Sequence, residues 1–451
     1  MAPLGIDRRA LESFRAEEDR RFRERTPRSA ALLERARASQ PLGVPMSWFA
    51  SLYQHAPPVV ASGSGAWFED VDGNRYLDMN LVDLAGALGF ANPVVTAAVE
   101  AALERGTSFL LPTEEGIAAT ERLAEITQLP YWQFTGAASG ANVELIRIAR
   151  VATGRSKILK FDGSYHGHID ETLVVEGEEG LQSEGLGLPA KALDDVKIVP
   201  FNDLEAVERA LAPGDVACLL SEPVLTNCNL IFPDPGFWDQ VRELTRAAGT
   251  LLYIDEAHSY SFAFGGMTRA LAIEADGQLM GKGLGSGIPF AVYGVTEDLG
   301  RLLETHLDRD GSLQQGIALG GTTYANVMAL AVARAVLTEV LSESAYAENA
   351  ELGNRLGDGL EAIFKQRGLD WRAPRIGGRS GWILGPDLPR SALEAAASLD
   401  PLFVATRRIF MANRGVWEAI STSGPAASFM HQEADIDRYL AVAEDFLAAV
   451  T

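Results

Sequence analysis

The chain has 451 residues, of which 47% are hydrophobic and 22% are charged, and 39 Lys and Arg against 61 Asp and Glu give a formal net charge of −22. A chain of this length can bury a sizeable core in two or three folding units, which excludes a minimal binding module. The acidic balance argues against nucleic-acid and membrane partners, because both are bound through clustered positive charge.

Cysteine usage and hydropathy indicate the cellular setting. The two cysteines, Cys218 and Cys228, cannot form a disulfide framework, and their spacing does not resemble a zinc site. The sequence has no run of 18 or more apolar residues that would suit a membrane helix, and its first residues lack the apolar stretch of a secretory signal. The sequence therefore predicts a cytoplasmic protein in a reducing compartment, without a resident metal.

The first predicted elements are a helix and a hairpin. Residues 15–38 interleave arginines with acidic residues, a pattern that favours one solvated amphipathic helix over an acid-poor targeting peptide. After a loop-rich stretch, residues 66–77 alternate in polarity around Asp72-Gly73. This alternation predicts a β-hairpin, because Asp-Gly is favoured in tight turns between antiparallel strands.

Helical periods then alternate with short apolar runs, which predicts an α/β fold with a mostly parallel sheet and helices on both faces. The expected helices span 94–103 and 143–151, and the expected strands span 131–134, 158–161, 216–220, 251–254 and 290–295. Helices at 327–341, 345–364 and 433–450, with strand-like runs near Trp382 and Phe403, predict a smaller α+β unit. We therefore expect an N-terminal segment that joins the small domain (1–60), a large domain (61–330) and a C-terminal small domain (331–451).

Ligands of such sheets bind at the carboxyl ends of the strands. The strand at 251–254 ends in Asp255-Glu256-Ala257-His258, where Asp255 is either a ligand group or a helix cap or surface ion pair. The strand at 131–134 leads through Ala138, Ser139 and Gly140 into a helix. Free backbone N–H groups at this turn, with the Ser139 hydroxyl, can hold a phosphate, although a plain turn has the same composition.

Two further strand ends carry reactive side chains. The loop after Phe161 offers Tyr165 as a stacking ring or a packed side chain, and His166 and His168 lack a third metal ligand at a suitable spacing. Of the six lysines, only Lys282 lies in an uncharged, glycine-rich stretch, where poor solvation favours the nucleophilic free amine. A nucleotide P-loop does not fit, because the glycine spacing is one residue short and Gly283 stands where Ser or Thr is needed.

An isolated amine, a carboxylate, an aromatic ring and an anion-binding turn are together the parts that pyridoxal 5′-phosphate (PLP) requires. With these residues in place, the chain resembles the class III aminotransferases of PLP fold type I, and within them the glutamate-1-semialdehyde aminomutase-like group. The resemblance runs from about Gly43 to the C-terminus and is carried by the segments GAWFEDVDGNRYLD, ASGAN, FDGSYHGH, SEPVLTN, LLYIDEAH, MGKGLGSGIP and GGTTYAN. It implies a large domain with a seven-stranded type of sheet and a smaller α+β domain.

The resemblance also implies roles for single residues. Lys282 matches the Schiff-base lysine that also moves the proton, and Asp255 matches the carboxylate paired with the pyridine nitrogen. Tyr165 matches the ring that stacks on the cofactor. The remaining matches are His166 beside that ring, Ala138, Ser139 and Gly140 at the phosphate, Asn227 at the phenolic oxygen, and Thr322, which reaches the phosphate of the neighbouring subunit. A symmetric homodimer with shared active sites is implied.

The chain departs from the family pattern at two places. The usual Gly-Thr-Glu turn reads Ala138-Ser139-Gly140, and the Gly-Phe-Arg segment after Asp255-Glu256 is replaced by AHSYSFAFGG. Arg379 is the candidate replacement for the missing arginine, because its planar fork suits a carboxylate, unless it is a surface residue. Trp48 is either a wall of the substrate site or a core residue, and His258 either touches the pocket or is a satisfied core histidine.

The leading hypothesis is a PLP-dependent aminotransferase that moves an amino group from an amino acid to a keto acid, ketone or aldehyde. An aminomutase or racemase, in which one molecule keeps its amino group, is the alternative. A PLP-fold protein kept for binding or regulation is disfavoured by the presence of both Lys282 and Asp255.

Overall fold

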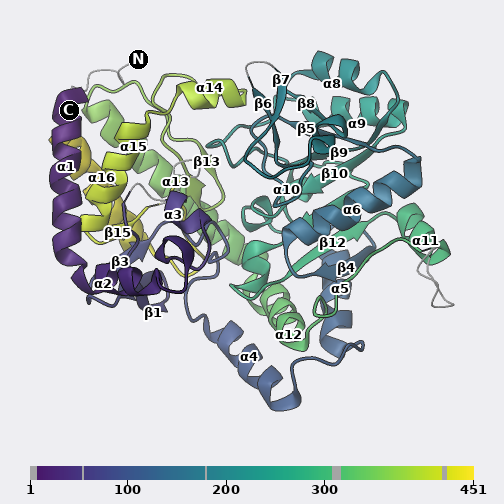
Figure 1. Ribbon diagram of the computed structural model, residues 1–451, viewed down its shortest axis with the longest axis horizontal. Coiled ribbons are helices and arrows are strands. Elements are labelled where there is room, and N and C mark those ends of the chain that lie inside the picture. Colours follow the sequence, from purple (N-terminus) through teal and green to yellow (C-terminus); the bar gives the residue numbers. More distant parts are fainter. Residues whose placement is uncertain (1–7, 53–54, 178–179, 307–315, 419–423) are drawn as a thin grey trace. The chain divides into compact units, whose positions relative to one another are not determined.

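The computed structural model describes residues 8–52, 55–177, 180–306, 316–418 and 424–451. The chain divides into two compact units, shown in Figure 1. One unit comprises Met1–Asn92, Ala347–Leu388 and Ala395–Thr451, and the other comprises Pro93–Tyr346 and Pro389–Glu394. Each unit is therefore assembled from segments that are far apart in the sequence.

The unit around Pro93–Tyr346 contains a seven-stranded sheet in the order β4-β12-β11-β10-β9-β5-β8. The strands are β4 (Tyr131–Thr135), β5 (Lys157–Phe161), β8 (Val196–Val199), β9 (Val216–Ser221), β10 (Leu251–Asp255), β11 (Gly277–Met280) and β12 (Ala291–Val295). Strands β8, β5, β9, β10 and β11 run parallel, and β12 is antiparallel to both of its neighbours. The predicted α/β fold with a mostly parallel sheet is confirmed.

Helices alternate with these strands along the chain, and several of them pack on the sheet. Their bounds are α4 (Pro93–Arg105), α5 (Glu114–Ile126), α6 (Ala138–Thr153), α7 (Lys191–Asp194), α8 (Leu204–Leu211), α9 (Phe237–Ala248), α10 (Met267–Ala270), α11 (Glu297–Thr305) and α12 (Val327–Ala335). Helix α6 contacts β9, β11 and β12, α8 contacts β8, and α9 contacts β10. All six residues of β9 are buried, because a central parallel strand is covered on both faces. A two-stranded ribbon, β6 (Val174–Gly177) with β7 (Gly180–Ser183), lies outside the main sheet.

The other unit is built around a four-stranded sheet in the order β1-β2-β3-β15. Its strands are β1 (Val60–Ser64), β2 (Trp67–Asp70), β3 (Arg75–Asp78) and β15 (Val416–Trp417), and a small hairpin pairs β13 (Arg375–Ile376) with β14 (Arg379–Ser380). The remaining helices are α1 (Arg8–Arg25), α2 (Pro27–Ala36), α3 (Trp48–Leu52), α13 (Glu343–Gln366), α14 (Ala392–Ala397), α15 (Pro401–Asn413) and α16 (Glu433–Val450), of which α13 and α14 begin with residues of the unit around Pro93–Tyr346. A hydrophobic core that includes Trp371, Phe403 and Phe446 joins α1, α13, α15 and α16.

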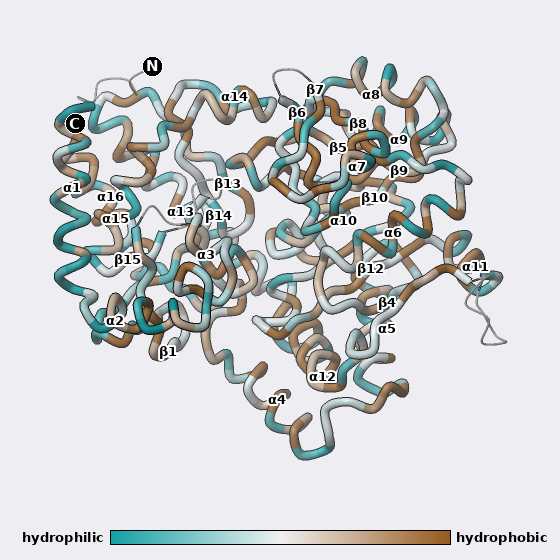
Figure 2. Tube along the Cα trace, in the orientation of Figure 1, coloured by the Kyte–Doolittle hydropathy of each residue, from teal (hydrophilic) through white to brown (hydrophobic). Residues whose placement is uncertain are grey.

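The N-terminal helix is where the structure first corrects the sequence analysis. One helix was expected over 15–38, but α1 and α2 meet at Thr26-Pro27, because proline is favoured in the first turn of a helix and disrupts a helix interior. Figure 2 shows α1 as largely hydrophilic, yet Leu11 and Phe22 are buried and α1 packs on α15. The helix is therefore only partly solvated.

The strand-like run at Phe403 is a second correction, because this residue lies inside helix α15. The carboxylate of Asp400 accepts a hydrogen bond of 2.8 Å from the Phe403 N–H, and Pro401 occupies the first turn. An aspartate cap followed by proline is a helix start signal that outweighs a short apolar run. Within the seven-stranded sheet, β8 and β11 were not predicted, because each strand is short and contains a polar residue, Lys197 and Gln278 respectively.

The hairpin is confirmed, with a connection of four residues between β2 and β3. Asp70 stabilises this turn, because its Oδ1 atom accepts hydrogen bonds from the backbone N–H groups of Asp72 and Asn74. In the ranges that the structure describes, no helix has both the length and the apolarity to cross a bilayer.

Candidate active site

The carboxyl ends of neighbouring parallel strands bring the predicted residues to one edge of the seven-stranded sheet. Asp255 is the last residue of β10 and pairs in register with Leu279 of β11, three positions before Lys282. Glu222 directly follows β9, and the loop that carries Tyr165 and His166 follows β5. Strands β5, β9, β10 and β11 are consecutive in the sheet, so residues from four chain segments meet at this edge.

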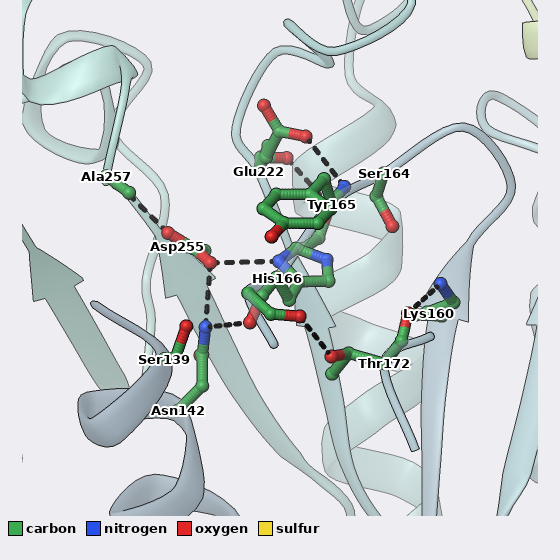
Figure 3. A network of polar contacts seen from close by, with 12 residues as sticks. Ser139, Asn142, Lys160, Ser164, Tyr165, His166, Thr172, Glu222, Asp255 and Ala257 are labelled. Carbon is green, nitrogen blue, oxygen red and sulfur yellow. Dashed lines mark hydrogen bonds and ion pairs between the residues drawn. The ribbon is translucent and has the colours of Figure 1, made fainter. Parts of the chain in front are cut away.

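Asp255 is the centre of a buried polar network, which Figure 3 shows. Its Oδ2 atom lies 2.9 Å from Nδ1 of His166 and accepts a hydrogen bond of 2.9 Å from the side-chain amide of Asn142. Its Oδ1 atom accepts a hydrogen bond of 3.0 Å from the Ala257 N–H. The same Asn142 amide also donates to the backbone carbonyl of His166, at 2.9 Å. Asn142 therefore ties helix α6 to both partners.

The surroundings favour the ionised form of Asp255. Burial by itself raises the pKa of this carboxyl, but the hydrogen bond and charge of His166, with the donors from Asn142 and Ala257, bring the net pKa below its usual value. Because an ionised carboxylate only accepts hydrogen bonds, Nδ1 of His166 carries the proton. The site therefore holds a fixed negative charge at the end of β10.

The N-terminus of α6 faces the same loop. No side chain caps this 16-residue helix, and the hydroxyl of Ser139 accepts a hydrogen bond of 3.0 Å from the His168 N–H. A Cβ atom on Gly167, which has a φ of +89°, would lie 2.2 Å from the Ser139 hydroxyl, so only glycine permits this approach. Uncapped N–H groups at a helix start are suited to a phosphate.

Lys282 begins the turn after β11 (Lys282–Gly285) and has a φ of +49°, a left-handed conformation that is uncommon for a residue with a side chain. The side chain is half-buried. The preceding Gly281 approaches the first turn of α6, because a Cβ atom there would lie 3.2 Å from the Cβ of Ala138. The predicted amine and the predicted phosphate turn are therefore neighbours.

A second network is centred on the buried carboxylate of Glu222. One oxygen accepts hydrogen bonds from the Tyr165 N–H at 3.3 Å and from the Asn227 side-chain amide at 3.2 Å. The other oxygen accepts from the N–H and the hydroxyl of Thr226, and this hydroxyl lies 2.6 Å from Nδ1 of His258. Tyr165, Asn227 and His258, predicted from three separate segments, are thus joined through one carboxylate.

Sequence reasoning missed Asn142 and Glu222 as site residues. Asn142 lies one helical turn after Ser139, and Glu222 occupies the position after a buried strand, so both stand within segments that the resemblance had marked. Glu256 has a supporting function: it is fully buried and accepts hydrogen bonds from Ser259, Met267, Thr268 and Gln278. Over the part of the chain that the structure describes, no group of three His, Cys, Asp or Glu residues could hold a metal ion.

Three further predicted residues differ in their burial and in the unit to which they belong. Thr322 is exposed in the loop before α12. Arg379 belongs to the other unit and is only 1% exposed, so its alternative reading as a surface arginine is wrong. Trp48, also in that unit, is 50% exposed, so the alternative reading of it as a core residue is wrong as well.

Comparison with known proteins gives the family of this chain. A family model described as aminotransferase class-III matches residues 49–399. The chain belongs to the class-III aminotransferase family. It is a PLP-dependent enzyme with the type I fold, as the sequence predicted.

The relatives of this chain include proteins named as aminomutases and proteins named as transaminases. The chain is 35% identical to the glutamate-1-semialdehyde 2,1-aminomutase of Gemmatimonas aurantiaca, over 94% of this chain and 96% of the relative. It resembles the crystal structure of a lysine-to-alanine variant of the glutamate-1-semialdehyde aminomutase from Pseudomonas aeruginosa PAO1 in complex with PMP. There the TM-score is 0.95 and the identity 32%, with 99% of this chain and 100% of the other covered. An omega-transaminase from Sphaerobacter thermophilus gives a TM-score of 0.84 and 30% identity, covering 93% and 96% of the two chains.

Proposed function

We propose that this enzyme moves an amino group between two carbons of one molecule, in the manner of a glutamate-1-semialdehyde 2,1-aminomutase. The observation that carries this proposal is the nearly full-length similarity to proteins of that name, in both sequence and structure. The proposal replaces transfer between two molecules, the leading hypothesis from the sequence, as the favoured form of the reaction.

The described residues fit PLP. The uncapped start of α6 suits its phosphate, and the buried carboxylate of Asp255 suits a protonated ring nitrogen. Nε2 of His166 and Oδ1 of Asn142 are buried and have no hydrogen-bond partner within the described residues. Each of these two atoms can therefore still form a hydrogen bond with a bound group. Tyr165, the residue expected to stack on the ring, is 42% exposed.

Bound PLP supplies an aldehyde carbon that bonds to an amine and a ring that delocalises negative charge from the substrate carbon. The chain supplies the proton transfers and the electrostatics. The Lys282 amine anchors the cofactor and, when released, takes a proton from one substrate carbon and returns it to another position. Asp255, held ionised by His166 and Asn142, keeps the ring nitrogen protonated so that the ring can accept electrons.

A two-substrate aminotransferase is the second candidate. It is favoured by the similarity to an omega-transaminase, which is 30% identical with a TM-score of 0.84. Both reactions begin with the same removal of a proton by Lys282, so the network around Asp255 serves either one.

One experiment separates the two candidates. The PLP-loaded protein is given glutamate 1-semialdehyde with no added donor or acceptor, and 5-amino-4-oxopentanoate is measured. Catalytic formation of this isomer supports the aminomutase, and Lys282→Ala is the matched control without the amine. If the isomer does not form, but a panel of amino acids converts the cofactor to its amine form and a keto acid restores it, the aminotransferase is correct.

We also propose a symmetric homodimer in which the exposed Thr322 completes the phosphate site of the partner. Lys282→Ala and Thr322→Val chains are each purified and then mixed under conditions that exchange subunits. If sites are shared, a mixed dimer regains one intact site and activity returns. Mixing that restores nothing, in a protein shown to exchange, contradicts the shared site.

A further inference from the structure

The network at Glu222 specifies which nitrogen of His258 carries a proton. Glu222 is 4% exposed and receives four donors on two oxygens: the N–H groups of Tyr165 and Thr226, the Asn227 amide and the Thr226 hydroxyl. A carboxylate without a proton accepts all four, whereas a protonated carboxyl would place its own O–H among donors. The donors therefore match an ionised Glu222.

The direction of the next hydrogen bond follows. A threonine hydroxyl has one proton, and Thr226 directs it to Glu222, because the carboxylate can only accept. Toward His258, 2.6 Å away, the hydroxyl oxygen then has only a lone pair to offer. Nδ1 of His258 must donate, so the neutral imidazole keeps its lone pair on Nε2.

His258 is also fixed close to the predicted ring partner. It lies three residues after Asp255, is 4% exposed, and follows Ala257, whose N–H donates to Asp255 at 3.0 Å. Glu222 additionally holds the backbone of Tyr165 and the amide of Asn227. One carboxylate thus supports residues from the loops after β5, β9 and β10.

We propose that Glu222 and Thr226 are positioning residues that lock His258 in the Nδ1–H tautomer and so present Nε2 as a hydrogen-bond acceptor at the cofactor edge of the sheet. The inference rests on PLP-dependent amino transfer, but it concerns hydrogen bonds that exist without substrate. Thr226 and His258 lie in the segments SEPVLTN and LLYIDEAH, outside the motifs of the amine and the phosphate turn.

The test reads the tautomer directly. Side-chain nitrogen NMR is recorded on histidine-labelled protein with and without PLP, and His258→Gln identifies the His258 signals among only six histidines. The expected result is an Nδ1-protonated ring in the wild type and in Thr226→Ser, which keeps the hydroxyl. In Thr226→Val, which has the same shape without it, Nε2 becomes the main protonated nitrogen, and the visible circular dichroism of bound PLP changes.

An Nε2-protonated His258 in the wild type overturns the proposal without any variant, so a valine variant that fails to fold does not remove the test. The proposal is equally overturned if the valine variant keeps the wild-type tautomer, or if the serine variant behaves like the valine variant. A wild type that shows the expected tautomer but transfers no amino group contradicts the proposed function alone.

Discussion

Replacing Asn142 with leucine removes the donor that joins helix α6 to Asp255 and to the His166 carbonyl, at nearly constant side-chain volume. Asn142 is fully buried, so water cannot take its place. The variant leaves a buried carboxylate with one donor fewer and a buried carbonyl without its amide. The substitution changes neither Lys282 nor the residues Ala138 to Gly140 themselves.

The size of the effect follows from the kind of bond that is lost. A hydrogen bond to a charged group contributes about 1.5–3 kcal/mol, so the free energy of unfolding should fall by about 2 kcal/mol, or roughly 2–4 °C in Tm for a protein of this size. The same loss weakens the support of an ionised Asp255, so the dissociation constant for PLP should rise by about tenfold.

The pH dependence has a definite sign. Because hydrogen bonding holds the pKa of Asp255 below its usual value, the stabilisation is present above the usual aspartate pKa and is lost as the pH falls through the folded-state pKa. The difference in unfolding free energy between the variant and the wild type should therefore stay constant between about pH 5 and 8.

Thermal unfolding of the cofactor-free protein and titration with PLP measure both quantities. Asn349→Leu is the matched control, because Asn349 is also buried, donates to the neutral Ala427 carbonyl at 2.9 Å, and belongs to the other unit. The free energy of unfolding of this control variant should fall by about 1 kcal/mol, and its dissociation constant for PLP should equal that of the wild type. If Asn142→Leu loses no more stability than this control and binds PLP as the wild type does, the assigned role of Asn142 is wrong.

Three further predictions address other features. Gly167→Ala should weaken phosphate and PLP binding, because the new Cβ would clash with the Ser139 hydroxyl. Gly187 has a similar φ of +93° and no atom within 4 Å of a Cβ, so Gly187→Ala should affect only stability. Titration of both variants with PLP compares them. Burial raises the pKa of Asp78 to about 7. The free energy of unfolding, measured with a denaturant, should therefore fall by at most about 4 kcal/mol as the pH rises from about 4 to about 7. Asp78→Asn should abolish this pH dependence. Arg379→Ala should raise KM for carboxylate-bearing substrates while leaving carboxylate-free amines unaffected, and equal kinetics for both classes would remove Arg379 from substrate recognition.

The parts of the fold that the sequence predicted are those governed by local pattern. Continuous apolar runs correctly predicted β9 and β10, and the Asp-Gly turn correctly predicted the β2–β3 hairpin. Both predictions were possible because a buried strand and a tight turn each need particular side chains at nearby positions. The strand β11 was missed because Gln278 interrupts its apolar character. Its amide is satisfied by Glu256, a partner that is 22 positions distant and invisible to local patterns.

For the candidate site, the sequence by itself determined which reactive groups are available: an amine at Lys282, a carboxylate at Asp255 and a helix start at Ser139 that suits an anion. Reactive side chains, glycines and helix starts can be recognised from a few consecutive residues, so no knowledge of the fold is needed to find them. Only the tertiary structure decided how these groups are held. The charge of Asp255 and the orientation of His166 and His258 depend on Asn142, Glu222 and Thr226, which reach them from other strands and helices. Hydrogen bonds between distant segments form only when the parallel strands align their ends, and that alignment is a property of the folded sheet.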